Sequence, residues 1–413
     1  MTDLDLSRFI RPGDTVTWGE GTAEPLPLTR ALVQSRADLQ PITVFVLTVF
    51  SDTLQPEYAD ALRFAGLGPV GTTRRLAREA GFETYPIHLS ALPGFIADGT
   101  IPLDVVLVQV SPADEHGRHS LGVVVDYLPT AIEHARVVLA EVNVQMPYTL
   151  GDTLIDGSVF AETVETDRPV LELPAPQLGP IEQQIGARTA TLVPDGATIQ
   201  VGVGSLPAAV LAAFHDKTDL GVHSGIVGDG ILELIERGVV TNRRKTIDTN
   251  ITVASALFGS RRLYDYAQRN PALTLRSVDY THRLETLAAI DDLIVINSAV
   301  EVDLTGQVNA ETVPGHSVGA VGGQVDFIRG AAASRRGRSL ILLKSTVRGG
   351  VSRIVSRLNE GVVTTARSDV DTVITEWGVA DLRGRSNSER ARSLAAIAHP
   401  DFRDELLSEQ HLL

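Results

Sequence analysis

The chain repeats one pattern of elements in its two halves, and this repeat limits its possible folds more than any other feature. Residues 10–25 (IRPGDTVTWGEGTAEP) open the first half, and residues 192–207 (LVPDGATIQVGVGSLP) open the second. Each segment predicts a turn of Pro, Gly and Asp, a short β-strand, a Gly-x-Gly and a proline that enters a helix. In a second matching pair, residues 103–117 and 290–306, an apolar strand ends in a polar turn closed by glycine.

Short, continuous apolar strands alternate with amphipathic helices in both halves, which is typical of βαβ units around a buried parallel sheet. The sequence therefore predicts a duplicated α/β fold. Residues 167–180 (DRPVLELPAPQLGP) contain four prolines, so we expect a linker or an extended crossover there. We place the domains at 1–180 and 181–413. Ligands of open α/β sheets bind beyond the carboxyl ends of the strands, so the site should lie where the two copies face each other.

The composition argues against several classes of function. The chain has no cysteine, and its ten histidines do not cluster at ligand spacing, so we expect neither a disulfide nor a metal. The formal net charge of −15 argues against a nucleic-acid partner. No apolar run approaches the roughly 18 residues of a membrane helix. The first ten residues (MTDLDLSRFI) do not resemble a secretory signal. We expect a cytoplasmic protein without a membrane partner.

Two glycine-rich turns are candidates for binding an anion or a carbonyl oxygen. Val201–Pro207 (VGVGSLP) combines a strand, a Gly-x-Gly and a helix start, although a plain tight turn explains the pattern equally well. In Val318–Ala331 (VGAVGGQVDFIRGA), Gly322 and Gly323 precede a strand-like QVDFI. Their N–H groups could form an oxyanion pocket, or the pair could mark a β-bulge. Lys344 ends the apolar strand SLILL and could bind a phosphate or extend into solvent.

Residues 220–230 (LGVHSGIVGDG) look like the catalytic turn of an enzyme. Adjacent residues of an extended segment point to opposite faces, so His223 and Ser224 should not form a base–nucleophile pair. His223 could instead be a structural histidine where the domains meet. Residues 231–238 (ILELIERG) predict a short helix that Asp229 can cap.

Taken together, these segments resemble the acetyl-CoA hydrolase/transferase family, in particular its 4-hydroxybutyrate and butyryl-CoA:acetate CoA-transferases of the class I CoA-transferase superfamily. The resemblance covers nearly the whole chain. Besides the turns above, it includes VSPADEHG from Val110, SLGVVVDY from Ser120, NVQMPYTLGD from Asn143, INSAVEVDLTGQV from Ile296 and TEWGVADLRG from Thr375. It implies two similar α/β domains of the NagB-like (CoA-transferase) fold, mainly parallel sheets flanked by helices, and a homodimer.

The resemblance also implies the chemistry. The substrate would be a coenzyme A thioester, with a small carboxylate as an optional acceptor and no permanently bound cofactor. A glutamate would attack the acyl-CoA, carry CoA as a glutamyl thioester and hand it to the acceptor. The CoA-binding positions that carry over are Gly202, Val203, Gly204, Ser205, Leu206, Gly322, Gly323 and Lys344, with Ala299 as a weaker match.

The family's catalytic turn, His-Thr-Glu-x-x-Ser-Asp-Gly, aligns without a gap with residues 223–230. The alignment puts Gly225 where the resemblance implies the glutamate. A second departure is DYTH, residues 279–282, where the resemblance implies an asparagine-containing turn. Glu20, in the matching WGEG loop of the other half, could replace the missing carboxylate from across the cleft, or be a plain polar loop residue.

Three functions follow from this pattern. In the first, the space beside Gly225 admits water or a substrate group, His223 or Asp229 positions it, and the amides of Gly322 and Gly323 bind the oxyanion. Thioester hydrolysis, C–C cleavage or another acyl-CoA conversion would then be possible. The second is CoA transfer with a relocated nucleophile such as Glu20, or by direct exchange. The third is a catalytically silent acyl-CoA binder. We favour the first.

Overall fold

The computed structural model describes residues 4–347 and 350–409. Its largest sheet belongs to the first half and has the order β12-β9-β7-β1-β2-β4-β6, with every strand pair parallel. Its strands are β1 (Thr15–Trp18), β2 (Ile42–Phe45), β4 (Leu62–Gly66), β6 (Glu83–Thr84), β7 (Val105–Val110), β9 (Val137–Asn143) and β12 (Glu162–Thr166).

The second half forms a sheet of order β14-β13-β19-β24-β28-β29, parallel except for the antiparallel last pair. Its strands are β13 (Thr198–Val201), β14 (Gly221–Val222), β19 (Leu293–Ser298), β24 (Arg338–Leu342), β28 (Thr372–Thr375) and β29 (Gly378–Asp381). The run β9-β7-β1-β2 of the first sheet has the same connectivity as β24-β19-β13-β14 of the second. The predicted α/β fold with two matching parallel sheets is therefore confirmed.

Helices cover both faces of each sheet, because the central strands are apolar on both sides. In β19, Ile294 and Ile296 belong to the core under α6 (Pro180–Ala190) and α7 (Ser205–Ala212), whereas Leu293 and Val295 belong to the core under α11 (Leu284–Ala288) and α12 (Gln324–Ala333). In the first sheet, β7 alternates in the same way between the core under α1 (Leu26–Gln34) and the core under α4 (Leu92–Ala97) and α5 (Leu128–His134).

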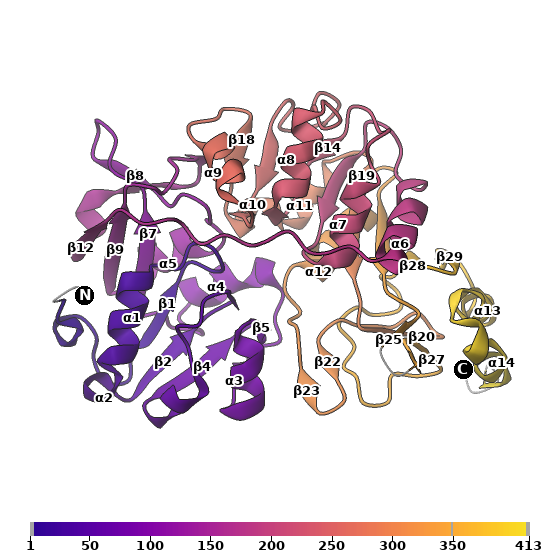
Figure 1. The fold of residues 1–413 in the computed structure, drawn as a ribbon, viewed down its shortest axis with the longest axis horizontal. Coiled ribbons are helices and arrows are strands. Elements are labelled where there is room, and N and C mark those ends of the chain that lie inside the picture. Colours follow the sequence, from indigo (N-terminus) through magenta and orange to yellow (C-terminus); the bar gives the residue numbers. More distant parts are fainter. Residues whose placement is uncertain (1–3, 348–349, 410–413) are drawn as a thin grey trace.

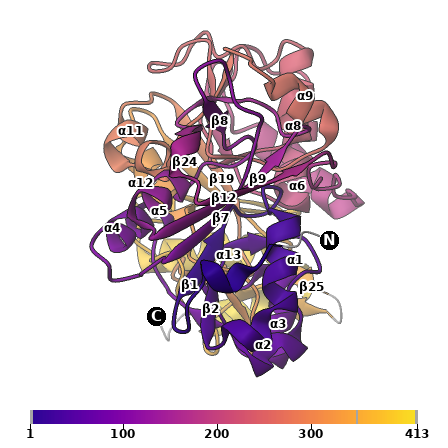
Figure 2. The same cartoon turned by 90° about the vertical axis from the view of Figure 1, so that its left-hand side faces the viewer.

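The remaining α-helices include two that pack on the first sheet, α2 (Arg36–Leu39) and α3 (Thr73–Glu79); the others belong to the second half. These others are α8 (Asp229–Glu236), α9 (Arg261–Ala267), α10 (Val278–Thr281), α13 (Asn387–Ile397) and α14 (Arg403–Ser408). Figure 1 shows the two sheets side by side, and Figure 2 shows the first half turned toward the viewer. Within the described residues, no helix is long and apolar enough to cross a membrane.

The proline-rich stretch between the two sheets has no regular secondary structure from residue 167 to 179, and α6 begins at Pro180. It crosses the front of the molecule in Figure 1. This is the predicted linker. The domain limits themselves, 1–180 and 181–413, stay a prediction. A small sheet crosses that limit, since β10 (Leu150–Gly151) pairs with β18 (Leu273–Leu275).

The sequence predicted a strand for the segment QVDFI, but in the structure this segment is the start of α12. Five residues of mixed pattern cannot distinguish a strand from a helix. The continuation RGAAA decides it, because Val325, Ile328 and Ala331 then share one buried helix face. The two glycines before it consequently lie at a helix N-terminus, where N–H groups lack partners within the helix.

Candidate functional site

The predicted catalytic turn lies where the two halves of the chain meet. The carbonyl oxygen of Gly225 accepts hydrogen bonds from the N–H groups of Ser255 (2.8 Å) and Ala256 (2.9 Å). On the other side, the N–H of Val125 donates to the carbonyl of Ser255 at 2.9 Å, and Val124 bridges to Ala256. We call this contact of residues 123–126 with residues 253–257 the seam. The segment around Ser255 thus lies between the turn and the first half, and it is hydrogen-bonded to both.

The space beside Gly225 is not open. A Cβ atom on Gly225 would lie 3.1 Å from both Cε1 and Nε2 of His282 and 3.7 Å from Cε2 of Phe327. The same imidazole lies against Gly323, where a Cβ would approach Cδ2 and Nε2 to 2.5 Å. The expectation of a vacant space for water at Gly225 is therefore wrong: the ring of His282 lies there, between two glycines that the sequence placed in the site.

His282 is fixed by contacts on three sides. It follows α10 directly, and its ring packs edge-on against Phe327 of α12 with 4.6 Å between centroids. Its Nδ1 lies 2.9 Å from Oγ1 of Thr281, which in turn lies 2.6 Å from Oγ of Ser255. Burial, followed by the nearby His223, lowers the pKa of His282 to about 3, so the imidazole is neutral at pH 7.

His223 holds the backbone of Thr281, the residue that precedes His282. It is fully buried, and its Nε2 donates to the carbonyl oxygen of Thr281 at 3.1 Å, while Nδ1 has no hydrogen-bond partner among the described residues. Burial and then the charge of Lys245 lower the pKa of His223 to about 3. Ser224 Oγ contacts the backbone of Val201. His223 is therefore a neutral histidine bound to the backbone beside His282.

Asp229 does not cap the helix predicted at 231–238. The helix α8 begins at Asp229 itself, behind Gly228, and no side chain caps it. The carboxylate of Asp229 instead accepts hydrogen bonds from Ser260 N (3.0 Å) and Ser260 Oγ (2.8 Å), at the start of α9. Asp229 thus joins two helices, which is a structural use of this carboxylate.

Glu20 lies next to a second acidic residue, Asp126, which belongs to the seam. It is 6% exposed, and its Oε2 accepts from the N–H of Thr48 at 3.3 Å. The carboxyl group of Asp126, which is 2% exposed, interacts with it, although Oδ2 of Asp126 has no hydrogen-bond partner among the described residues. Burial raises the pKa of Glu20. Burial and then the charge of Glu20 raise the pKa of Asp126 well above its usual value. Each carboxyl group thus keeps its proton to a higher pH than it would in water.

Asp126 was missed in the sequence, where it only ends the apolar run LGVVVD. Its backbone oxygen accepts from the N–H of Val278 at 3.0 Å, at the start of α10. The carboxyl pair and His282 therefore lie at opposite ends of one short helix. Val125 and Gly225 bond to opposite sides of Ser255, which puts these two segments about 10 Å apart at ordinary strand spacing.

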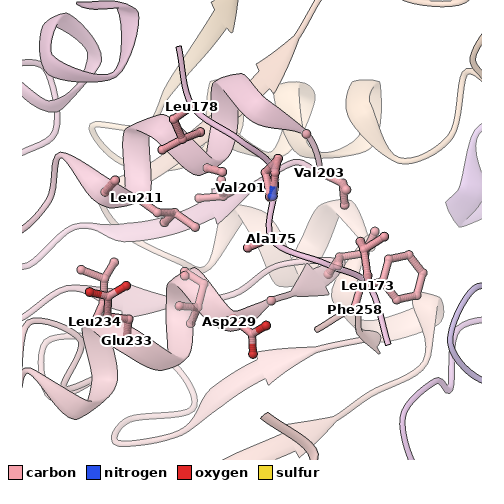
Figure 3. Close-up of a pocket in the computed structure, with 18 of the residues that line it drawn as sticks. Leu173, Ala175, Leu178, Val201, Val203, Leu211, Asp229, Glu233, Leu234 and Phe258 are labelled. Atoms are coloured by element: carbon pink, nitrogen blue, oxygen red, sulfur yellow. The ribbon is translucent and has the colours of Figure 1, made fainter. Parts of the chain in front are cut away.

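The glycine loop after β13 opens into an apolar pocket of about 290 Å³. Gly204 has φ +126°, which favours glycine, and precedes α7, so Ser205 and Leu206 form the first turn of that helix. Val203 is exposed at the loop tip. Figure 3 shows the pocket between this loop, α7, α8 and the linker, with lining side chains that include Leu173, Ala175, Leu178, Val201, Leu211 and Phe258.

The other predicted CoA-binding positions are spread along the second sheet. Lys344 forms an ion pair with Glu182 of α6, with 2.5 Å between Nζ and Oε1. Ala299 is half-buried and donates its N–H to the carbonyl of Leu342. Gly322 has φ +52°, and its carbonyl accepts from Leu89 of the first half. Of the predicted residues, the structure brings Gly225 and Gly323 together, through His282.

Comparison with known proteins identifies the family to which this two-sheet α/β chain belongs. The N-terminal domain model of the acetyl-CoA hydrolase/transferase family matches residues 1–172, and its C-terminal domain model matches residues 259–410. The chain belongs to this family of CoA-transferase and acetyl-CoA hydrolase enzymes.

Relatives of known activity and structure match along nearly their whole length. The chain is 39% identical to the 4-hydroxybutyrate coenzyme A transferase of Clostridium kluyveri, covering 95% of this chain and 93% of that protein. Among solved structures, RipA from Yersinia pestis is 36% identical with a TM-score of 0.92, covering 98% and 96% of the two chains. A 4-hydroxybutyrate CoA-transferase from Porphyromonas gingivalis is also 36% identical, with a TM-score of 0.83, covering 98% and 95%. The matched relatives are mostly CoA-transferases, and acetyl-CoA hydrolases also occur among them.

Proposed function

We propose that this protein hydrolyses an acyl-CoA thioester by direct attack of water, without a glutamyl intermediate. The observation that carries the proposal is the contact at Gly225. The position where the resemblance implies a glutamate has no side chain, and the imidazole of His282 lies against it. Ping-pong transfer needs a carboxylate there to form the anhydride and then the thioester.

The hydrolysis balances with water alone. The water oxygen attacks the thioester carbonyl carbon, the C–S bond breaks, and the products are a carboxylic acid and free CoA. Negative charge develops on the carbonyl oxygen during the attack. The first N–H groups of α12, from Gly323 onward, lack helical partners and are offered to this oxyanion.

For the CoA portion we propose the segment from Gly202 to Leu206, at the mouth of the apolar pocket, together with Lys344. The loop offers backbone N–H groups at the start of α7, and Lys344 offers a positive charge. The acyl group itself is left open by these contacts. A homodimer and a cytoplasmic location stay predictions of the sequence.

CoA transfer with Glu20 as the nucleophile is the competing function, and the family relationship gives it weight. The structure supports it less. Glu20 is almost wholly buried next to Asp126, and its Oε2 already accepts from the N–H of Thr48. To attack a thioester it would have to leave this position. Burial also favours its protonated form, which is not nucleophilic.

Release of free CoA from a panel of acyl-CoAs, with and without acetate, tests the proposal. The products are identified by mass, which also detects C–C cleavage. We expect CoA release that does not depend on acetate. Acetyl-CoA formed only in the presence of acetate would show transfer, and its loss in Glu20→Gln would then identify Glu20 as the nucleophile. Tight acyl-CoA binding without turnover would show a silent binder.

A further inference from the structure

We propose that Nε2 of His282 is the catalytic base that accepts the proton of the attacking water. This inference rests on the proposed hydrolysis and names the group that makes it possible. The sequence did not assign His282 a role. The structure assigns one by position, because the ring lies between Gly225 of the catalytic turn and Gly323 of the turn that offers the oxyanion donors.

Two absent side chains make room for this ring. A Cβ at Gly323 would lie 2.5 Å from Nε2, and a Cβ at Gly225 would lie 3.1 Å from it. Any side chain at Gly323 would therefore displace the imidazole, and even a methyl group at Gly225 would press on it. Nε2 thus lies against both glycines, and in this proposal a thioester bound at the N-terminus of α12 has its carbonyl carbon within reach of Nε2.

The hydrogen bonds at the other side of the ring leave Nε2 free to accept a proton. Thr281 donates its hydroxyl proton to the carbonyl of Ser277, which can only accept, at 3.1 Å. Its Oγ1 then accepts from Ser255 Oγ and from His282 Nδ1, at 2.6 Å and 2.9 Å. This assignment uses every proton in the group. With the proton on Nδ1, Nε2 presents its lone pair.

Nε2 also remains accessible. His282 is only 4% exposed, and its Nε2 has no hydrogen bond among the described residues. This atom is nevertheless not wholly buried, so it keeps some exposed surface. In His223, by contrast, Nδ1 is wholly buried and has no hydrogen-bond partner among the described residues. Of these two neighbouring histidines, His282 is the one that can reach a water molecule.

The proton transfers balance without a further reactant. Nε2 takes one proton from water as the water oxygen bonds to the thioester carbon, which gives an imidazolium. When the C–S bond breaks, the imidazolium returns this proton to the CoA sulfur. Burial lowers the pKa of His282 to about 3, so the imidazole is neutral before the attack but a weak base, and the nearby oxyanion must stabilise the imidazolium. The low pKa also favours return of the proton to the sulfur afterwards. His282 is thus regenerated in each turnover.

His282→Ala and His282→Asn test the proposal, with His119→Ala as the matched control. His119 also packs edge-on against a phenylalanine, Phe160, but in the first half. We expect both His282 variants to lose about 100-fold or more in kcat for CoA release. Both variants should still fold, with a melting temperature lowered by the lost packing against Phe327, and their CoA affinity should stay near that of the wild type. Added imidazole should restore part of the rate of His282→Ala, because it can enter the space left by the ring. A merely structural role would not show this rescue.

Each outcome separates this inference from the function on which it rests. If the wild type releases CoA into water and both His282 variants stay within tenfold of it, the base is another group and the inference is wrong. A folded His282→Ala that binds CoA, lacks activity and gains nothing from imidazole contradicts it as well. If the wild type releases no CoA without acetate, the proposed hydrolysis itself fails, and the role of His282 fails with it.

Discussion

Glu20 and Asp126 lie close enough at the seam for each carboxyl group to affect the pKa of the other, and both are almost wholly buried. Neither can ionise there as easily as in water, because burial penalises the charge and each carboxylate repels the other. This buried pair links the first half of the molecule to α10, which ends next to His282. It also makes the stability of the protein depend on pH in a defined direction.

The pair should lower stability as the pH rises. The pKa values of both groups are raised above their usual 4.5 and 3.8. Their contribution is therefore complete below pH 3.8 and is lost as the pH passes upward through the raised values. Above about pH 4 the unfolded chain releases protons that the folded chain still keeps. Each retained proton changes the free energy of unfolding by up to about 1.4 kcal/mol per pH unit.

Asp126→Asn should flatten this dependence, because the amide cannot ionise. The measurement is the free energy of unfolding from urea titrations between pH 4.5 and 8, with the exposed Glu133→Gln as control. A variant whose stability falls with pH as steeply as that of the wild type would show that Asp126 ionises freely in the folded protein.

Lys245 should make the protein more stable at alkaline pH. Its Nζ donates to the carbonyls of Val222 (2.9 Å) and Ile251 (2.7 Å), and burial lowers its pKa from 10.5 to about 8. Because the folded pKa is depressed, the penalty for burying the charge is present in full below pH 8 and disappears by pH 10.5. The expected gain across this window is on the order of 3 kcal/mol.

Lys245→Met removes the titrating group and should lose this gain, whereas Lys217→Met, at a less buried lysine, should keep it. Chemical denaturation at a series of pH values measures both. Equal pH profiles for the wild type and Lys245→Met would contradict the assigned burial of the charge.

The contact between Gly225 and His282 predicts the effect of placing a carboxylate at position 225. Gly225→Glu alone should be destabilised by about 1–3 kcal/mol, because its Cβ lies 3.1 Å from the imidazole, and it should not transfer CoA. In Gly225→Glu with His282→Asn, the smaller amide leaves room for the carboxylate. This double variant should form acetyl-CoA from an acyl-CoA and acetate.

The stabilities of the two single variants should not add in the double variant, since the residues touch. Melting curves of the four proteins of this cycle measure that coupling. A Gly225→Glu single variant as stable as the wild type, or one that already transfers CoA, would show that His282 does not limit the space at position 225.

Lys344 is predicted to contact CoA, yet it is paired with Glu182. Glu182→Gln should free the ammonium group and tighten CoA binding, while Lys344→Met should weaken it. A half-exposed ion pair is worth up to about 1 kcal/mol, so each change in Kd should be about fivefold or less. Calorimetric titration with CoA checks both. Unchanged Kd values in both variants would place Lys344 outside the CoA site.

The sequence predicted the fold well because the features that determine it are local. Strands buried on both faces carry long apolar runs such as β7, and the glycine turns after β1 and β13 repeat in both halves. The candidate turn at residues 220–230 was also visible, and the absence of a carboxylate at Gly225 stays a prediction.

What the sequence could not predict depends on contacts between distant segments. Gly225 and His282 are far apart in the sequence, so nothing local indicates that the imidazole ring lies against the glycine. Asp126 and Glu20 likewise pair only after folding. Asp229 was expected as a cap because it precedes a helix, but the hydroxyl and amide of Ser260 compete for its carboxylate.

Single turnover of an acyl-CoA in ¹⁸O-labelled water, with acetate present, tests the central claim most directly. Direct attack by water puts labelled oxygen into the carboxylate of the released acid, and the account predicts this label together with free CoA. In transfer through an enzyme carboxylate, the acid takes its oxygen from that carboxylate, and CoA passes to acetate. An unlabelled acid accompanied by acetyl-CoA would contradict the account.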